Sequence, residues 1–329
     1  MSAALSIVAS GAVFGGSLLA AGVIAPSVIV GQMQLTDMHM LKVFVVGSAS
    51  SALVLRGLQR LGYILKARAP TNLGWLGNYD GNIIGGLLIG IGMTLTGSCP
   101  GTVFAQFGSG IQSGPYTLAG GFLGGIMYTS VSKNLKTQKA KDSAPSNLLT
   151  IPQKTGMDAN IVLLLFEALC ASIVALSTQL SPNPSTRLSP LFGGLLIGFS
   201  QLTSVLLTKS TLGISSSYEE VGEWFWRVIT PSTKERVSST SIIFALGATC
   251  GSFAVSRIWP ELVQRDVMVL GPSRTVVGGA VMAFGSRLGS GCTSGHGISG
   301  MSLLSVSSII SVISMFAGGI MTAAMMARI

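Results

Sequence analysis

The stretch GGLLIGIGMTLTGSCPG, residues 85–101, has a counterpart in GGAVMAFGSRLGSGCTS, residues 278–294. Laid over each other without a gap, the two stretches align Gly85 with Gly278, Gly86 with Gly279, Gly92 with Gly285, and Cys99 with Cys292. Earlier in each half, VFGGSLLAAG from Val13 and LFGGLLIGFS from Leu191 share an FGG start to a glycine-rich segment. Two matches in the same order predict that the chain arose by internal duplication.

The composition is that of a membrane protein. Of the 329 residues, 48% are hydrophobic and only 9% are charged, and the mean hydropathy is +0.64. Residues 81–132 contain no Asp, Glu, Lys, Arg or His, whereas one span needs only about 20 apolar residues. Residues 1–36 also lack these side chains, so we expect a retained helix there rather than a cleaved signal peptide. The chain is therefore predicted to be an all-α polytopic membrane protein of about nine to eleven helical pieces, some shorter than a full span.

The net charge of +9 comes mainly from two short polar segments. Their basic residues are Arg56, Arg60, Lys66 and Arg68 in the first, and Lys133, Lys136, Lys139, Lys141 and Lys154 in the second. Under the positive-inside rule, such segments are cytoplasmic loops of a membrane protein. The surplus charge therefore implies no nucleic-acid partner.

Three segments follow along the chain. We predict a first membrane repeat at 1–132, a polar Lys-rich linker at 133–158, and a second repeat at 159–329 with an extra leading helix. If both basic segments are cytoplasmic, the extra helix carries the chain across the membrane, and the second repeat is inverted. Inverted repeats place a substrate site near the membrane midplane, where broken or re-entrant helices surround a central pathway.

Both cysteine motifs are predicted to be such helix breaks. Proline suits the first turn of a helix, so Pro100 makes Cys99 an N-cap, with free N–H groups of the next residues directed back toward the thiol. Glycines at both motifs allow a close approach of backbone to a small ligand, and irregular backbone at membrane depth must line a cavity or lie inside protein. The predicted substrate contacts are Ser98, Cys99, Gly101 and Thr102 in the first motif, and Cys292, Thr293, Ser294, Gly295 and His296 in the second.

Other polar or reactive residues carry competing interpretations. Cys170 and Cys250 lie in smooth apolar runs and are expected only to pack. His296 can bind substrate, relay a proton or hydrogen-bond a carbonyl, and Glu167 and Arg287 either face the interior or reach toward a membrane surface. No CxxC pair and no zinc-type spacing is present, so no metal or cofactor is predicted.

At these motifs the chain resembles the YeeE/YedE sulphur-transport family. The resemblance is carried by GSRLGSGCTSGHGISGMSLLS at 285–305, GIGMTLTGSCPGTVFAQFGSG at 90–110 and GAVFGGSLLAAGVIAPSVIVGQ at 11–32. It implies an hourglass-shaped protein of the cell membrane, not an enzyme, that passes thiosulfate along cysteines without permanent covalent bonds, and it implies a small accessory sulphur-carrier protein as a partner. Thiosulfate-uptake members have a further cysteine in the first glycine-rich helix, whereas LLAAGVIAPS at 18–27 has none.

The leading functional hypothesis is uptake of a small inorganic sulphur anion, with thiosulfate first. Thiol S–H groups and backbone N–H groups can serve such a dianion, so no Lys or Arg is required in the pathway. Inward movement of two negative charges against about 100 mV costs about 4.6 kcal/mol, so uptake needs coupling or intracellular consumption. The alternatives are a membrane thiol enzyme, such as a sulphurtransferase or oxidoreductase, and a channel or soft-metal transporter using Cys99, Cys292 and His296.

Overall fold

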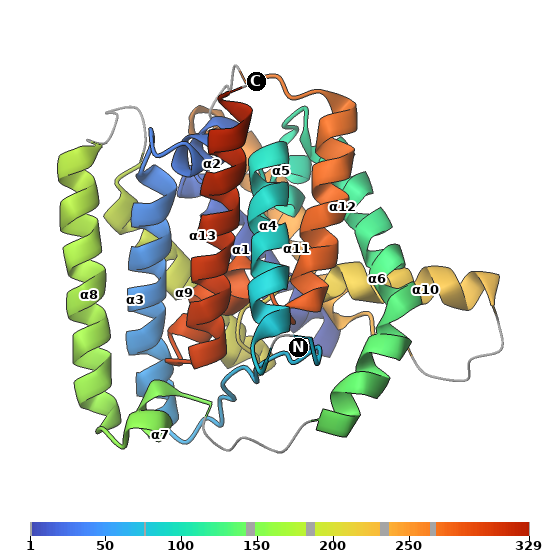
Figure 1. The fold of residues 1–329 in the computed structure, drawn as a ribbon. Helices are drawn as coiled ribbons and strands as arrows, with labels where there is room; N and C mark the ends of the chain where they lie inside the picture. Colours follow the sequence, from blue (N-terminus) through green and yellow to red (C-terminus); the bar gives the residue numbers. More distant parts are fainter. Residues whose placement is uncertain are drawn as a thin grey trace.

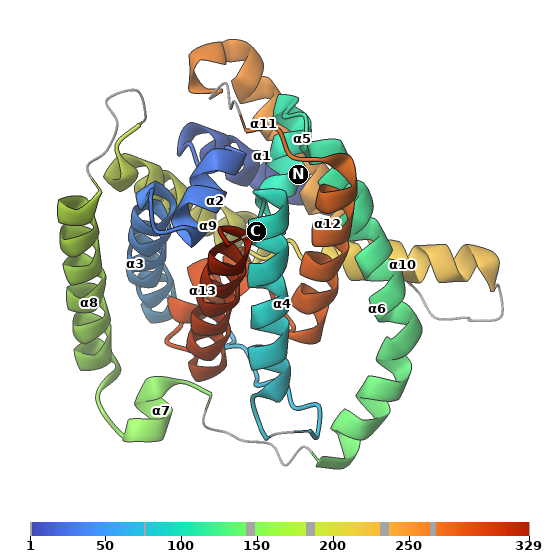
Figure 2. The ribbon, with the colours of Figure 1, turned by 45° about the horizontal axis from the view of Figure 1, so that its top comes forward.

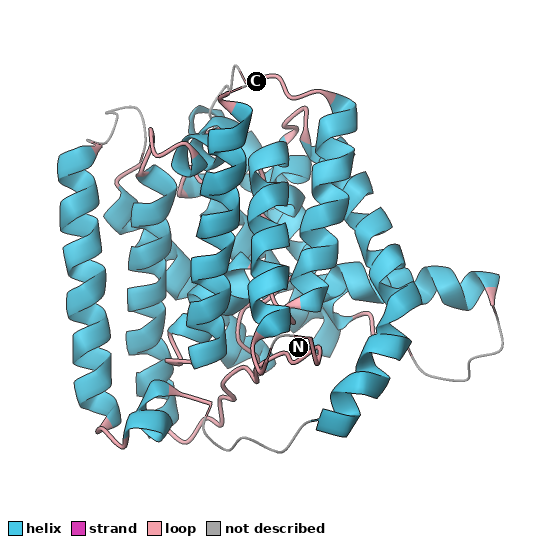
Figure 3. Ribbon diagram, in the orientation of Figure 1, coloured by secondary structure: helices cyan, strands magenta, loops and turns pink. Residues whose placement is uncertain are grey.

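The computed structural model describes residues 2–75, 77–142, 149–181, 188–230, 237–263 and 268–328, and these form helices without a β-strand (Figure 3). The first half contains α1 (Ala3–Ala20), α2 (Pro26–Met33), α3 (His39–Arg60), α4 (Asp80–Thr96), α5 (Thr102–Ser109) and α6 (Gly114–Asp142). The second half contains α7 (Ile151–Thr155), α8 (Ala159–Leu180), α9 (Pro190–Thr208), α10 (Ser216–Ile229), α11 (Thr240–Ile258), the 3-10 turn η1 (Pro260–Leu262), α12 (Pro272–Leu288), the π-helix η2 (Thr293–Met301) and α13 (Val306–Met326).

Six of the described helices are long and apolar enough to cross a membrane, namely α1, α3, α8, α9, α11 and α13. The helix α4 is apolar but shorter, and α2, α5 and η2 are short pieces beside helix breaks. The prediction of an integral, multi-pass, all-α membrane protein with partial spans is confirmed.

Glycines at the centre of the molecule let α4 and α12 cross in contact. A Cβ added to Gly85 would lie 2.7 Å from the Gly285 oxygen, and one added to Gly92 would lie 2.6 Å from the Gly278 oxygen. In the sequence register, Gly85 corresponds to Gly278 and Gly92 to Gly285, so these are one contact repeated by symmetry. The contacts also run in opposite directions along the two helices (Figure 1). Equivalent helices that are antiparallel require a two-fold axis perpendicular to them, which is the geometry of an inverted repeat.

The remaining helix pairs obey the same symmetry. Along α1, Gly15 packs on α11, and in the equivalent pair Gly47 of α3 packs on α9. Likewise Gly120 of α6 packs on α12, and Gly90 of α4 packs on α13. Small residues allow the close backbone approach that stabilises helix pairs in a membrane, where there is little hydrophobic gain between helices.

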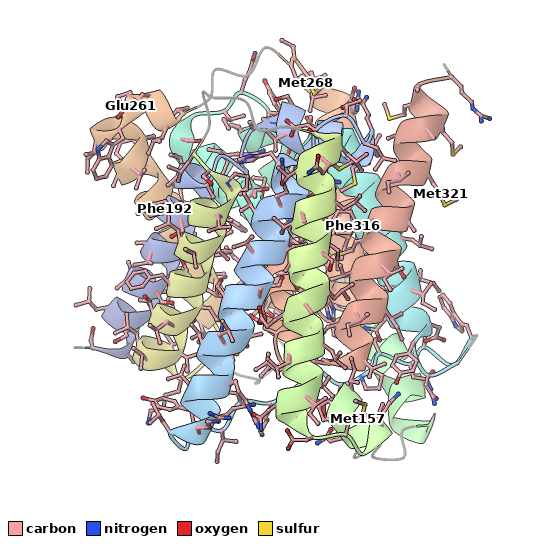
Figure 4. All side chains as sticks on the ribbon, turned by 90° about the vertical axis from the view of Figure 1, so that its left-hand side faces the viewer. Met157, Phe192, Glu261, Met268, Phe316 and Met321 are labelled. Atoms are coloured by element: carbon pink, nitrogen blue, oxygen red, sulfur yellow. The ribbon has the colours of Figure 1, made fainter. Side chains whose placement is uncertain are left out.

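The extra helix α8 lies outside this arrangement. It packs on α3 at the edge of the molecule (Figure 2) and exposes most of its apolar side chains, including Leu164 and Leu169. Figure 4 shows α8 running the height of the molecule, with Met157 near its start at the end opposite Glu261 and Met268. The helix therefore returns the chain to the other end before the second repeat begins.

The predicted linker is partly structured. The helix α6 extends to Asp142, past the boundary predicted at residue 132, and residues 143–148 lie outside the described residues. Beyond them, the Ile151 N–H donates to the Leu304 oxygen at 2.9 Å, and the Val306 N–H donates to the Leu149 oxygen at 3.1 Å. The end of the linker thus packs directly after η2.

Both basic segments lie at one end of the molecule. The Arg56 and Arg60 guanidinium groups donate to the Asn160 side chain at the start of α8, and Lys154 donates to the Tyr79 hydroxyl. We predict that this end is cytoplasmic, because the positive-inside rule applies to it. Cysteines placed at Lys66 and Lys139, with the exposed Cys250 replaced by alanine, should react with an impermeant maleimide only from the cytoplasmic side. Labelling of either from outside intact cells would contradict the topology.

Candidate functional site

The first cysteine motif is a helix break with a sharp reversal. The helix α4 ends at Gly97, whose φ of +59° is left-handed, and a Cβ there would lie 2.6 Å from the Pro26 Cβ. Cys99 then precedes α5, and its Sγ accepts the Thr102 N–H at 3.3 Å while its own N–H donates to the Thr102 hydroxyl at 2.7 Å. The N-cap of α5 is Gly101, so the prediction that Cys99 itself is the N-cap is wrong: the chain makes a turn at Pro100 and Gly101 before the helix begins, and the Cys99 thiol reaches the first helical N–H from outside the helix.

Gln106 holds this break together. Its Nε2 donates to the Ile24 oxygen at 2.7 Å and to the Gly97 oxygen at 2.9 Å, so it ties the break after α4 to the break between α1 and α2. The hydroxyl of Ser98 donates to the Gln106 Oε1 and is fully buried. Ser98 consequently orients the supporting amide rather than facing open space.

The second cysteine motif repeats this backbone. Ser290, which corresponds to Gly97 in the sequence register, has a φ of +61°, and Cys292 is the extended N-cap of η2. The Cys292 side chain is fully buried, and its Sγ lies 3.2 Å from the Ser294 hydroxyl. The short π-helix, which widens the turn relative to an α-helix, is typical of functional sites.

Ser290 offers a test of this backbone. A non-glycine residue in the left-handed region costs about 1 kcal/mol, and no hydrogen bond of the Ser290 hydroxyl occurs among the described residues. Glycine removes this cost, but its greater entropy in the unfolded chain offsets part of the gain. We therefore expect Ser290→Gly to leave the midpoint temperature of unfolding in detergent unchanged or to raise it by about 2 °C. A fall of 5 °C or more would show that the serine side chain stabilises the break.

His296 is held at both ring nitrogens. Nε2 lies 3.0 Å from the Gly289 oxygen, and Nδ1 lies 3.0 Å from the Ser308 hydroxyl on α13. A carbonyl only accepts, so Nε2 carries the proton and donates, and Nδ1 accepts from Ser308. Of the three roles considered for this imidazole, this arrangement favours the hydrogen bond to a carbonyl.

The two motifs meet at one small cavity. Its volume is about 30 Å³, which is room for about two water molecules. Of the predicted contacts, Cys99, Gly101 and Thr102 line it from one repeat, and Thr293 and Ser294 line it from the other, among apolar side chains that include Phe14, Leu18, Val23, Phe44 and Ile298. Ser98, Cys292, Gly295 and His296 lie behind this lining.

The first turn of α10 and the segment before it also contact the two motifs, and this was not predicted. Tyr218 is fully buried, and its hydroxyl donates to the Pro100 oxygen at 2.9 Å. The Ser299 hydroxyl of η2 donates to the Leu212 oxygen at 2.7 Å, so the start of α10 is fixed between the two motifs. This segment corresponds to the connection between α1 and α2 in the first repeat, which the FGG match would have indicated.

Two arginines approach the second motif. Arg287 forms an ion pair with Glu219 of α10, in which the two side chains are 12% and 14% exposed. Arg68, predicted only as a loop charge, turns inward, where its Nε donates to the Gly295 oxygen at 2.7 Å and its Nη1 to the Ser290 oxygen at 2.8 Å. A partly buried cation beside the motif is therefore present although the anion hypothesis did not require it.

The other candidate groups separate from the site. Cys170 is buried in the apolar core and fits the packing interpretation, whereas Cys250 is exposed on α11, so its side chain is not packed as expected. Glu167 is partly buried on α8, and its Oε1 has no hydrogen-bond partner within the described ranges. The described residues contain no group of three His, Cys, Asp or Glu side chains that could hold a metal ion.

Comparisons with known proteins agree with this architecture. A family model described as "Sulphur transport" matches residues 20–321. Two proteins of Xylella fastidiosa, from strains Temecula1 and 9a5c and both named "Probable transporter", are each 28% identical over 137 residues. That alignment covers 93% of each relative and 42% of this chain, so nearly the whole relative matches less than half of the chain.

Proposed function

Because the chain belongs to the sulphur transport family, we propose that it takes up a small inorganic sulphur anion and that thiosulfate is this substrate. The observation that carries the proposal is the meeting of both cysteine motifs at one cavity, with the N-termini of α5 and η2 beside it. Helix N-termini present free N–H groups and a positive dipole end, which favour an anion. We propose Cys99, Cys292 and their neighbouring hydroxyls as the substrate contacts.

Both ends of thiosulfate, the terminal sulphur and the three oxygens, can bind to the proposed contacts. Its soft terminal sulphur can accept a weak S–H hydrogen bond, and its oxygens can accept from N–H groups and from the hydroxyls of Thr102, Thr293 and Ser294. We propose that both thiols act while neutral, since a thiolate would repel the dianion. The cavity of about 30 Å³ is small, so we propose that the site widens when the anion binds.

The cysteine that thiosulfate-uptake members have in the first glycine-rich helix is absent here, which affects how many thiols can contact the substrate. Leu18 and Val23, from the stretch LLAAGVIAPS, line the cavity with apolar side chains. We therefore propose that two thiols, rather than three, contact the substrate in this protein.

The two alternatives differ in what they would produce. A membrane sulphurtransferase or oxidoreductase would change the sulphur compound, whereas a transporter delivers it unchanged. A channel or Cu(I)/Zn²⁺ transporter would move a metal or would move anions without regard to their sulphur. The family and the names of the relatives point to a transporter rather than an enzyme.

The test is uptake of ³⁵S-thiosulfate by a sulphur-starved host whose own uptake systems are deleted, with sulfate, sulfite and selenite as competitors. We expect uptake above that of the empty host, competed by unlabelled thiosulfate about tenfold better than by sulfate. Equal competition by all four anions would contradict a thiosulfate-selective site, and no uptake would contradict the proposed function.

A further inference from the structure

Two partly buried arginines, Arg68 and Arg274, bind backbone at the broken helices from opposite ends of the molecule. Arg68 belongs to the connection between α3 and α4, at the end that carries Lys66. Arg274 lies in the first turn of α12, at the end that carries Met268. Each arginine belongs to one repeat and binds the broken helix of the other repeat.

Arg68 fixes the second motif while keeping donors unused. Two of its nitrogens bind the Ser290 and Gly295 oxygens, which flank Cys292. Its Nη2 lies beside Gly213 and Gly295, where an added Cβ would come within 3.0 Å and 2.8 Å of it, and within the described ranges Nη2 makes no hydrogen bond. The donors of Nη2 are thus available beside the motif.

Arg274 does the same at the first motif. Its Nη2 donates to the Thr94 oxygen and its Nε to the Leu95 oxygen, both at 3.0 Å, in the last turn of α4 before Cys99. Its Nη1 makes no hydrogen bond to any part of the chain that the structure describes. Arg274 lines a cavity of about 220 Å³ together with Val30 and Gln34.

A larger cavity adjoins Arg68. Its volume is about 680 Å³, and it is lined by Lys66, Ala67 and Ala69, the residues on either side of Arg68, and by Ser302–Leu304 at the end of η2. The start of η2, at Thr293 and Ser294, lines the small cysteine cavity. The Arg68 guanidinium binds the oxygen of Gly295, the residue after Ser294, so Arg68 contacts the segment that lines the cysteine cavity while its chain neighbours line the larger one.

Neither arginine is neutralised by the protein. No carboxylate forms an ion pair with Arg68 or Arg274 among the described residues, whereas Arg287 is paired with Glu219. A partly buried cation without a counter-ion is costly. Carbonyl oxygens satisfy part of each guanidinium, and an arriving anion would supply the missing negative charge.

We propose that Arg68 and Arg274 are two anion-binding stations that flank the cysteine cavity, and that the transported sulphur anion binds one on entering and the other on leaving. This inference rests on the proposed function. Each station combines a fixed positive charge with donors that are free, next to a cavity that leads toward its own end of the molecule.

The experiment compares Arg68→Gln, Arg68→Lys, Arg274→Gln and Arg274→Lys at matched membrane abundance. Initial rates of thiosulfate uptake are measured over a range of concentrations in cells and in inside-out vesicles. Arg60→Gln and Arg257→Gln, at exposed positions near the two ends and outside the cavities described above, are the matched controls. Each glutamine variant should lose about tenfold of its uptake at low thiosulfate, and each lysine variant should retain at least a third, because lysine keeps the charge.

The two stations should also differ kinetically. In cells, substitution of the outward-facing arginine should mainly raise the KM for thiosulfate. Substitution of the inward-facing arginine should mainly lower the maximal rate. These effects should exchange in inside-out vesicles, which a purely structural role would not produce. Equal losses in the lysine and glutamine variants, or normal glutamine variants, would overturn the inference while wild-type uptake stands. If wild-type uptake were absent, the proposed function would fail with it.

Discussion

Replacement of either Cys99 or Cys292 by alanine is expected to reduce thiosulfate uptake by about ten- to a hundredfold. A hydrogen bond to a charged group contributes about 1.5–3 kcal/mol, which corresponds to this range. The alanine variants lose the donor without creating a large cavity, since a thiol is small. Serine keeps a donor but replaces the soft thiol with a more strongly hydrated hydroxyl, so Cys99→Ser and Cys292→Ser should be partly active or inactive. The measurement is radiolabelled uptake at matched membrane abundance.

Cys170→Ala and Cys250→Ala are the matched controls, because they change the same side chain outside the site. Both should transport at close to the wild-type rate. Wild-type rates in both Cys99→Ala and Cys292→Ala would mean that the thiols do not contact the substrate. The channel hypothesis, in which backbone N–H groups alone serve the anion, would then be favoured.

The two thiols differ in their position relative to the cavity. Cys99 lines it, whereas Cys292 is fully buried behind Thr293 and Ser294. We therefore expect a low concentration of a small thiol reagent to modify Cys99 before Cys292.

Most of the fold could be predicted from the sequence because the evidence for it is local. The alignment of Gly85 with Gly278 and of Cys99 with Cys292 needs only the order of residues, and the absence of charges over 81–132 needs only composition. The inverted orientation then follows from one further helix between the repeats. The linker was less predictable, because residues 149–155 have a polar composition yet pair with the backbone after η2.

The supporting residues of the site could not be predicted in the same way. The side chains of Gln106, Tyr218 and Arg68 donate hydrogen bonds to backbone carbonyls of distant segments. Every residue has a backbone carbonyl, so the sequence does not show which carbonyl will accept a bond. Arg68 in particular has the same surroundings in the sequence as the exposed Lys66. What distinguishes them is the direction of the side chain, which depends on how the connection between α3 and α4 packs on η2.

The glycines at the crossing of α4 and α12 should be the positions at which a small change has the largest effect on folding. A Cβ at Gly92 would lie 2.4 Å from the Met282 Cβ, and one at Gly285 would lie 2.6 Å from the Leu88 Cβ. Real Cβ atoms do not approach this closely, so alanine must push the helices apart. Overpacking of this kind lowers the free energy of unfolding by about 1–3 kcal/mol. The contacted atoms are rigidly attached to the backbone and cannot move aside, so we expect the loss to be near the upper end of this range.

We therefore expect Gly92→Ala and Gly285→Ala each to lower the midpoint temperature of unfolding in detergent by about 5 °C or more. Gly92→Leu and Gly285→Leu should leave no folded protein. Gly57→Ala is the control, since an added Cβ there meets nothing within 4 Å, and it should be neutral or stabilising in a helix. Because Gly92 and Gly285 are exchanged by the two-fold axis, their variants should lose similar stability. A large loss of stability in one variant and none in the other would mean that the two glycines are not equivalent at this crossing. It would contradict the two-fold symmetry of α4 and α12.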